Sequence, residues 1–339
     1  MSREALETLF YPFVSGELEP VGNGRRALFL GAEPGFQLPD GFDASLHIVQ
    51  GFRPHFRALQ RSGLEVTPQA GGDGYDAALV LSGRHRGENE LCIADAIART
   101  RPGGLIVVAG GKDDGIASLR KRMADMVAID GHLPKYHGIV FWFRRPEDAE
   151  ATAGTLREGA KTDLVEGRFR TAPGMFSHDR IDAGSKLLAE NLPDHLSGRV
   201  ADFCAGWGYL ASEVAGRFPN VKTLNLYEAD FASLEAARAN LAEVKSPPLR
   251  FFWHDLAGEP VAERYDAIVM NPPFHLGRRA EPELGQAIIR TAISSLKSGG
   301  RLFLVANRQL PYEKTLAGAV SEIREIAGDR TFKVLAARR

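Results

Sequence analysis

The sequence predicts an α/β protein built from two tandem doubly wound, Rossmann-like domains, of which the N-terminal one is degenerate. Short apolar runs alternate with helical stretches along the chain, which indicates parallel strands joined by crossover helices. The same succession occurs twice, since Tyr75-Asp76 and Tyr265-Asp266 each open a strand and a Gly-Gly turn precedes the next strand in both halves. We therefore expect one domain over residues 1–163 and another over residues 164–339.

Each expected strand is a short apolar run bounded by Gly, Pro, Asp or Asn, and the expected helices lie between these runs. In the first half, strands are expected over 27–31, 45–49, 77–81, 105–109 and 139–143, with helices through 56–59, 91–98 and 119–123. In the second half, strands are expected over 200–203, 223–227, 249–253, 267–270, 301–306 and 331–337, with helices beginning near 210 and covering 313–326. The polar stretch 146–161 is expected to be a linker or a surface helix.

Composition and charge limit the classes to which the chain can belong. Of its 339 residues, 44% are hydrophobic and 25% are charged, as in globular proteins with sizeable cores. The net charge of −1 means that any nucleic-acid role must depend on local basic patches. The cysteines, Cys92 and Cys204, lie far apart, and no apolar leader or membrane-length run is present. We expect a cytoplasmic protein without membrane contact, and a monomer.

The two halves differ in the residues that follow their strands. The second half has Gly206-Trp207-Gly208, Glu228 and Asn271-Pro272-Pro273-Phe274 where the first has Pro34, Gln50 and Ser82-Gly83-Arg84-His85. Pro34 removes a backbone N–H from the first loop. We therefore interpret the first half as a copy that keeps the fold and has lost the chemistry.

The glycine-rich loop 202–208 follows the first strand of the second half and includes Asp202, Cys204, Gly206 and Gly208. Its glycines let the backbone approach a nucleotide-like ligand closely. An ordinary tight turn between strand and helix would have the same pattern. The run from Gly206 also matches the dinucleotide fingerprint G-x-G-x-x-A, so the loop alone does not distinguish a nicotinamide cofactor from S-adenosylmethionine.

Two carboxylates follow the next two strands of the same half. Glu228 is suited to accept both hydroxyls of a ribose, and Asp255 to accept the exocyclic amine of an adenine. In isolation, either residue could instead cap a turn or helix. Their positions at successive carboxyl ends of one parallel sheet favour a shared nucleotide-like ligand.

Asn271-Pro272-Pro273-Phe274 ends the central strand and distinguishes between these cofactors. A hydride transferase has no use for this motif, whereas methyl transfer to an exocyclic amine does. If the Asn271 side-chain oxygen and the Pro272 carbonyl each accept an N–H, the nitrogen lone pair is directed at the methyl donor, and Phe274 stacks on the base. The structural alternative is a Pro-Pro strand terminator beside a buried Phe.

The chain resembles the bacterial small-subunit (16S) ribosomal RNA guanine-N2 methyltransferases, within the class I S-adenosylmethionine-dependent fold. The resemblance covers nearly the whole chain and is strongest over residues 173–177, 182–188, 271–275, 305–307, 310–312 and 332–334. It implies cofactor contacts at Asp202, Gly206, Gly208, Glu228 and Asp255, and substrate contacts at Asn271, Pro272, Pro273 and Phe274, which we take as the catalytic residues. We also expect Cys204 and Asn271 to contact the cofactor. Trp207 occupies a loop position that is usually small in the family.

The partner implied is ribosomal RNA or the small ribosomal subunit. RNA contact is expected at Arg278-Arg279, Arg84-His85-Arg86 and Arg120-Lys121-Arg122, although such runs are often solvated helix faces. Phe176 and the Asp182-Ala183-Gly184 turn either close over the cofactor or form a hydrophobic entry and a capped helix. The histidines show no metal spacing, so no metal is expected.

Four alternatives remain open at the level of sequence. Within methyltransferases, these are a guanine of 23S rRNA and the glutamine of a release factor, since Asn-Pro-Pro-Phe also occurs in other amino-group methyltransferases. The other two are an NAD-dependent oxidoreductase and a non-enzymatic RNA-binding protein.

Overall fold

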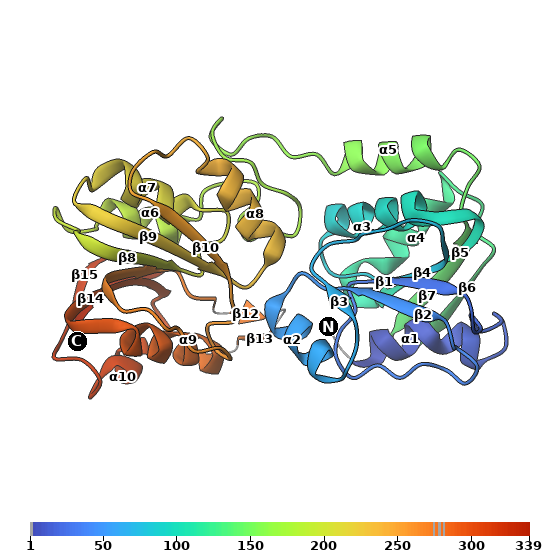
Figure 1. The fold of residues 1–339 in the computed structure, drawn as a ribbon, viewed down its shortest axis with the longest axis horizontal. Helices are drawn as coiled ribbons and strands as arrows, with labels where there is room; N and C mark the ends of the chain where they lie inside the picture. Colours follow the sequence, from blue (N-terminus) through green and yellow to red (C-terminus); the bar gives the residue numbers. More distant parts are fainter. Residues whose placement is uncertain (1–2, 274, 277–278, 281) are drawn as a thin grey trace. The chain divides into compact units, whose positions relative to one another are not determined.

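The computed structural model describes residues 3–273, 275–276, 279–280 and 282–339. The chain divides into two compact units (Figure 1). The N-terminal unit comprises Met1–Thr162 with Ala172–Gly174, and the C-terminal unit comprises Asp163–Thr171 with Met175–Arg339. Among the described residues, no helix is both long and apolar enough to cross a membrane.

The N-terminal unit contains a seven-stranded sheet in the order β3-β2-β1-β4-β5-β7-β6, parallel from β3 to β5 and antiparallel at β7 and β6. Its strands are β1 (Arg26–Leu30), β2 (Ser45–Val49), β3 (Val66–Thr67), β4 (Tyr75–Leu81), β5 (Thr100–Gly111), β6 (Gly131–Lys135) and β7 (Gly138–Arg144). Its helices are α1 (Arg3–Val14), α2 (Arg53–Arg61), α3 (Arg86–Arg99), α4 (Ile116–Ala124) and α5 (Ala149–Gly159), with a single 3₁₀ turn, η1 (Lys112–Asp114).

The C-terminal unit repeats this topology, with its sheet in the order β10-β9-β8-β11-β14-β16-β15. Its strands are β8 (Gly198–Phe203), β9 (Val221–Glu228), β10 (Leu249–Trp253), β11 (Tyr265–Met270), β14 (Leu296–Asn307), β15 (Glu322–Gly328) and β16 (Phe332–Arg338), and β12 (His275–Leu276) pairs with β13 (Arg279–Ala280). Its helices are α6 (Ala183–Glu190), α7 (Tyr209–Arg217), α8 (Phe231–Asn240), α9 (Pro282–Ser294) and α10 (Tyr312–Leu316). The duplicated, doubly wound α/β fold is therefore confirmed.

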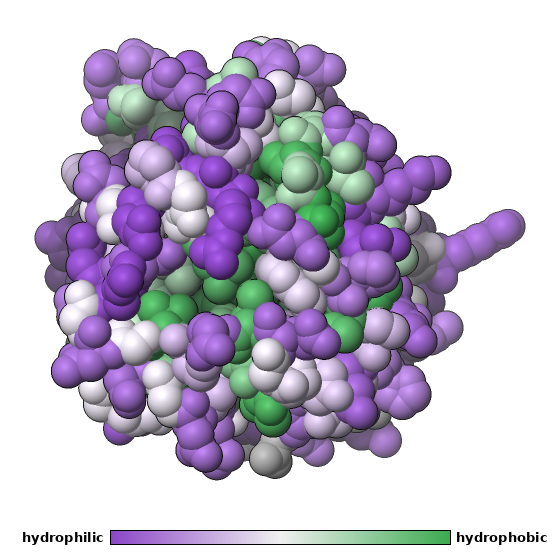
Figure 2. Space-filling model, turned by 90° about the vertical axis from the view of Figure 1, so that its right-hand side faces the viewer, coloured by the Kyte–Doolittle hydropathy of each residue, from purple (hydrophilic) through white to green (hydrophobic). Residues whose placement is uncertain are grey.

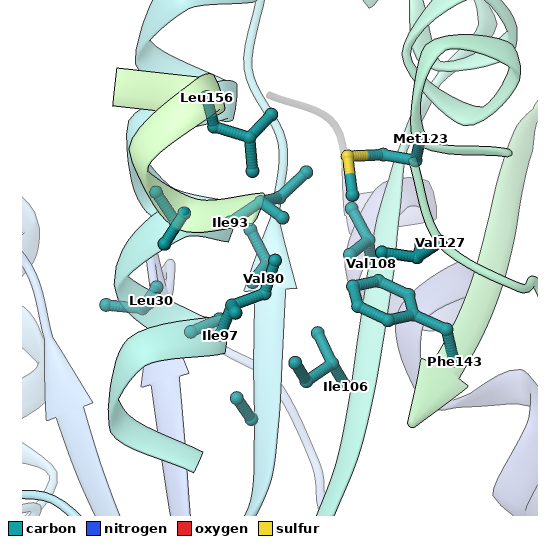
Figure 3. Packing of buried hydrophobic residues seen from close by; sticks show 14 of the residues in the cluster. Leu30, Val80, Ile93, Ile97, Ile106, Val108, Met123, Val127, Phe143 and Leu156 are labelled. Carbon is teal, nitrogen blue, oxygen red and sulfur yellow. The ribbon is translucent and has the colours of Figure 1, made fainter. Parts of the chain in front are cut away.

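Helices cover both faces of each sheet, which explains the nearly continuous apolar strands. In the C-terminal unit, α6, α7 and α8 pack on one face and α9 and α10 on the other. In the N-terminal unit, Ile93 and Ile97 of α3 and Leu156 of α5 pack over Val80 and Val108 of the sheet (Figure 3). Burying each such side chain contributes about 1.5–3 kcal/mol. Figure 2 views the side of the N-terminal unit, where hydrophilic residues cover most of the face and hydrophobic groups lie between them.

The prediction of a helix over 313–326 is wrong. Helix α10 ends at Leu316, Gly318 adopts a left-handed backbone with φ +79°, and residues 322–328 form β15. This strand pairs antiparallel with β16 at the edge of the sheet, so backbone hydrogen bonds to a neighbouring strand override the local helical preference.

The stretch expected to be a linker or a surface helix contains α5, a helix of the N-terminal unit. Ala149, Ala153 and Leu156 are buried, and their spacing places them on one face of the helix. That face packs in the core beside α3, so the stretch contains an amphipathic helix and is not a linker.

The two units differ immediately after their first strands. In the C-terminal unit, α7 begins at Tyr209, directly after the glycine-rich loop that follows β8. In the N-terminal unit, residues 31–44 connect β1 to β2 without a helix. The N-terminal unit therefore lacks the helix N-terminus that would face a ligand at this edge of the sheet.

Candidate active site

The glycine-rich loop leaves the carboxyl end of β8 through a series of left-handed backbone conformations. Cys204, Gly206 and Gly208 have φ values of +62°, +53° and +92°. A side chain at Gly208 would also lie 3.1 Å from the Ala237 Cβ atom of α8, so this position favours glycine for both conformation and space. Burial, together with the charges of Glu228 and Asp202, raises the pKa of the Cys204 thiol well above its ordinary value, so this thiol stays protonated.

Asp202 is a buried carboxylate at the end of β8. Its side chain is completely inaccessible, and neither carboxylate oxygen has a hydrogen-bond partner of good geometry among the described residues. Burial raises its pKa well above the ordinary value, and the backbone N–H of Ala211 offsets only part of that rise. Burying an acceptor without a hydrogen bond raises the free energy of the folded state. A cationic ligand group such as the ammonium of S-adenosylmethionine would stabilise the ionised form, but Asp202 is inaccessible and does not line the pocket, so the fit to this cofactor rests on the backbone of the glycine-rich loop and on Glu228.

Glu228 ends β9 and ties the glycine-rich loop to the neighbouring strand. Its Oε2 accepts the Gly206 N–H at 2.8 Å, and its Oε1 accepts the N–H groups of Ala229 and Asp230 at 2.8 and 2.9 Å. Burial raises the pKa of Glu228 to about 7, although these backbone donors act in the opposite direction. Oε1 uses both of its lone pairs in this way, whereas Oε2 has a further lone pair with which it can accept a ligand hydroxyl.

Asp255 follows β10 and stabilises a turn. Its Oδ1 accepts the backbone N–H groups of Ala257 and Gly258 at 3.1 and 3.0 Å, while Glu259 accepts the Asp255 N–H at 2.9 Å. The turn fixes the carboxyl group at the same sheet edge as Glu228, since Trp253 and Glu228 are register partners at the ends of β10 and β9. The contact with an adenine amine remains a prediction.

Asn271 follows β11 and lies next to the first turn of α6. Its Nδ2 donates to Asp182 Oδ2 at 2.9 Å and to Ser185 Oγ at 2.8 Å. Pro272 is buried and Pro273 is half-buried. Phe274 and Arg278 lie outside the described residues, and for Arg279 only the backbone, in β13, is described.

One pocket brings several of these elements together. Its walls come from loop residues 204–207, the start of α7, the first turn of α6, the segment 176–177 and Asn271. Asn271 therefore shares a cavity with the loop that carries Cys204 and Gly206. The described lining does not contain the predicted cofactor residues Asp202, Gly208, Glu228 and Asp255.

Trp207 is an anchor rather than an exposed part of the pocket rim. Only 4% of it is exposed, its ring centroid lies 5.1 Å from that of Phe169, and Asn240 donates to its carbonyl at 2.9 Å. Its Nε1 donates to the Phe176 carbonyl at 2.9 Å. The bulky residue therefore holds the backbone at Phe176, whose side chain is 56% exposed and lines the pocket.

Sequence reasoning missed the contacts of Asp182 and Ser185 with Asn271. Asp182 is the N-cap of α6 and accepts the Ser185 N–H at 2.7 Å, so its capping role was readable from sequence. The contact with Asn271 joins residues 89 positions apart and has no local signal.

The basic runs expected to contact RNA are partly neutralised in the structure. Arg84 pairs with Asp114 at 3.4 Å, and Arg86 and Arg122 both pair with Glu90, at 3.2 and 2.7 Å. Their RNA contacts remain predictions. Within the described ranges, no group of three or more His, Cys, Asp or Glu residues could hold a metal ion.

Together, the duplicated sheet, the glycine-rich loop and the Asn-Pro-Pro strand end define a class I methyltransferase. The methyltransferase small domain family matches residues 166–336. The chain is 32% identical over 265 residues to the ribosomal RNA small subunit methyltransferase C of Klebsiella pneumoniae, covering 74% of this chain and 72% of that protein. The protein of the same name from Psychromonas ingrahamii is 29% identical to this chain over 276 residues, covering 77% of this chain and 75% of that protein.

A solved structure also matches both units of the chain. The T. thermophilus 16S rRNA N2 G1207 methyltransferase RsmC, in complex with AdoMet and guanosine, superposes with a TM-score of 0.77 and 25% identity over 97% of this chain and 91% of that one. The chain belongs to the ribosomal RNA small subunit methyltransferase C family, and it is a methyltransferase of the S-adenosylmethionine-dependent type.

Proposed function

We propose that the protein transfers a methyl group from S-adenosylmethionine to N2 of a guanine in 16S rRNA. The observation that carries this proposal is the shared pocket, which Asn271 and the glycine-rich loop line together. The T. thermophilus RsmC structure, with AdoMet and guanosine bound, supports the pairing of this cofactor with this nucleoside.

In this proposal the cofactor is held by Asp202, Cys204, Gly206, Gly208, Glu228 and Asp255, with Asn271 beside it. Asp202 favours an ammonium group through its charge, Glu228 Oε2 accepts a ribose hydroxyl, and the glycines allow close approach of the backbone. The bound cofactor supplies an electrophilic methyl group. The C-terminal unit, which we take as residues 164–339, is thus the catalytic domain.

The residues around Asn271 act on the target amine. Asn271 Oδ1 and the Pro272 carbonyl each accept an N–H of the amine, Pro273 keeps the strand end rigid, and Phe274 stacks on the base. The nitrogen lone pair forms the new N–C bond, the bond between the methyl carbon and sulfur breaks with its electron pair leaving on sulfur, and the amine then loses a proton to solvent. The base leaves its stack to reach this site.

The relatives favour 16S rRNA over the alternatives. They are named as small-subunit RNA enzymes, which disfavours 23S rRNA, a release-factor glutamine, hydride transfer and a non-enzymatic role. As part of the proposal, the protein acts as a cytoplasmic monomer on ribosomal RNA or the small subunit, and the N-terminal unit, residues 1–163, is a degenerate domain that supports the fold and offers an RNA platform.

The test is in vitro methylation of 16S rRNA and of small subunits isolated from cells that lack the gene, with the product mapped by mass spectrometry. We expect incorporation of one methyl group at N2 of a guanine. Methylation of 23S rRNA or of a release factor in parallel reactions, with 16S rRNA unmodified, would refute the assigned target.

A further inference from the structure

The side-chain amide of Asn271 has a defined orientation. Its nitrogen donates to both Asp182 Oδ2 and Ser185 Oγ. An ionised carboxylate only accepts hydrogen bonds, so the NH₂ group, and not the carbonyl oxygen, must face Asp182. The assignment of the amide nitrogen therefore follows from the chemistry of its partner and does not depend on the similar shapes of oxygen and nitrogen.

The two partners are themselves held in place. Asp182 is the N-cap of α6 with φ −62° and ψ 130°, and the same Oδ2 accepts the backbone N–H of Ser185 at 2.7 Å. A carboxylate at a helix N-terminus is favoured by the helix dipole. Ser185 is only 8% exposed. The acceptors that receive the Asn271 amide are thus fixed to the first turn of a helix.

Resting on the function proposed above, we propose that Asp182 and Ser185 are positioning residues that hold Asn271 with its carbonyl oxygen toward the target amine. An asparagine amide rotated by half a turn has nearly the same shape but presents NH₂ in place of oxygen. Two donors would then face each other, and the lone pair of the amine would lose its alignment. The capped turn of α6 excludes this rotated state.

The N-terminal unit shows the same strand end without this arrangement. Ser82 follows β4 as Asn271 follows β11, and its hydroxyl is buried without a hydrogen-bond partner among the described residues. The orienting contacts therefore occur in the unit that has the Asn-Pro-Pro motif.

Asp182→Gly and Ser185→Ala test the proposal, because each removes an acceptor of the Asn271 amide and leaves a favourable start to α6: glycine is among the residues preferred at the N-cap, and the Ser185 cap bond uses its backbone N–H. We expect kcat to fall about 10- to 100-fold in Asp182→Gly and less in Ser185→Ala, with the affinity for S-adenosylhomocysteine unchanged. Ser233→Ala is the matched control, since Ser233 is a buried serine at the same position of the capped helix α8, and it should retain full activity.

A conservative variant separates orientation from a structural role. In Asp182→Asn the amide oxygen can accept both the Ser185 N–H and the Asn271 amide, as Asp182 Oδ2 does, so this variant should exceed Asp182→Gly by about 10-fold in kcat. Wild-type kcat in Asp182→Gly and in the Asp182→Gly/Ser185→Ala double variant would overturn the proposal.

A readout independent of turnover distinguishes this proposal from the function on which it rests. The two Nδ2 protons of Asn271, followed by side-chain amide NMR of the full chain, should exchange slowly with solvent and lose that protection in Asp182→Gly/Ser185→Ala, which lacks both acceptors. Slow exchange without methylation of RNA would refute the proposed function alone. Fast exchange in the wild type would refute the orientation alone.

Discussion

The two units have the same strand order but differ in how the residue ending the second strand contacts the loop after the first. In the C-terminal unit, Glu228 accepts the N–H of Gly206 in that loop. In the N-terminal unit, Gln50 donates to the carbonyl of Ala32 at 2.7 Å and accepts the Phe52 N–H at 2.7 Å. One loop thus presents an N–H to the strand end and the other a carbonyl. Either contact is compatible with the fold of the sheet. A ligand that requires a carboxylate, however, finds one only at Glu228 and not at Gln50.

The largest expected effect comes from removing the Asn271 side chain. Asn271→Ala deletes an acceptor that our proposal places at the reacting nitrogen, so kcat should fall at least about 10³-fold. Affinity for S-adenosylhomocysteine, measured by calorimetry, should stay close to that of the wild type. Turnover within tenfold of the wild type would contradict the role of Asn271.

Making the C-terminal unit resemble the N-terminal one should weaken cofactor binding. Glu228→Gln replaces a carboxylate that accepts three backbone N–H groups with an amide that has a single acceptor oxygen. We expect the dissociation constant for S-adenosylhomocysteine to rise about 10- to 100-fold. Unchanged affinity in a calorimetric titration would show that Glu228 only supports the loop.

The raised pKa of Glu228, about 7, predicts a pH dependence of opposite sign for binding and stability. As pH falls below about 7, the carboxyl binds a proton and cofactor affinity should fall by up to about tenfold per pH unit. Folding stability should change the other way between the ordinary value of 4.5 and about 7, because the folded state retains a proton that the unfolded state has lost, so its contribution decreases as pH rises. Glu228→Gln is the control in which both trends should disappear.

Making the N-terminal unit resemble the C-terminal one should have the smallest effect on cofactor binding. Gln50→Glu gives the N-terminal unit the carboxylate that it lacks, but Pro34 has no N–H and residues 31–44 form no helix. We expect calorimetry of the full chain to find one cofactor site both before and after this change. The new carboxylate would face the Ala32 carbonyl, so thermal unfolding should show a loss of about 1–3 kcal/mol. A second binding site would contradict the interpretation of the N-terminal unit as degenerate.

The duplicated fold was predictable because its signals are local and repeated. Apolar runs such as 267–270 and the turns around them indicate buried parallel strands wherever they occur. The edge strand β15 was not predictable in this way. Its residues were expected to continue a helix, and they form a strand because β16 offers a row of unpaired backbone groups.

The sequence by itself determined the fold class, the two copies and the residues expected to meet the ligand, since each depends on residues close together in the chain. Only the tertiary structure revealed that Asp202 is a buried acceptor with no well-aligned partner among the described residues, that Trp207 anchors the segment at Phe176, and that Asp182 and Ser185 accept the amide of Asn271. These contacts join residues 31 to 89 positions apart, or depend on burial by surrounding elements. Geometry of this kind arises when the sheet and its helices close, and no local pattern encodes it.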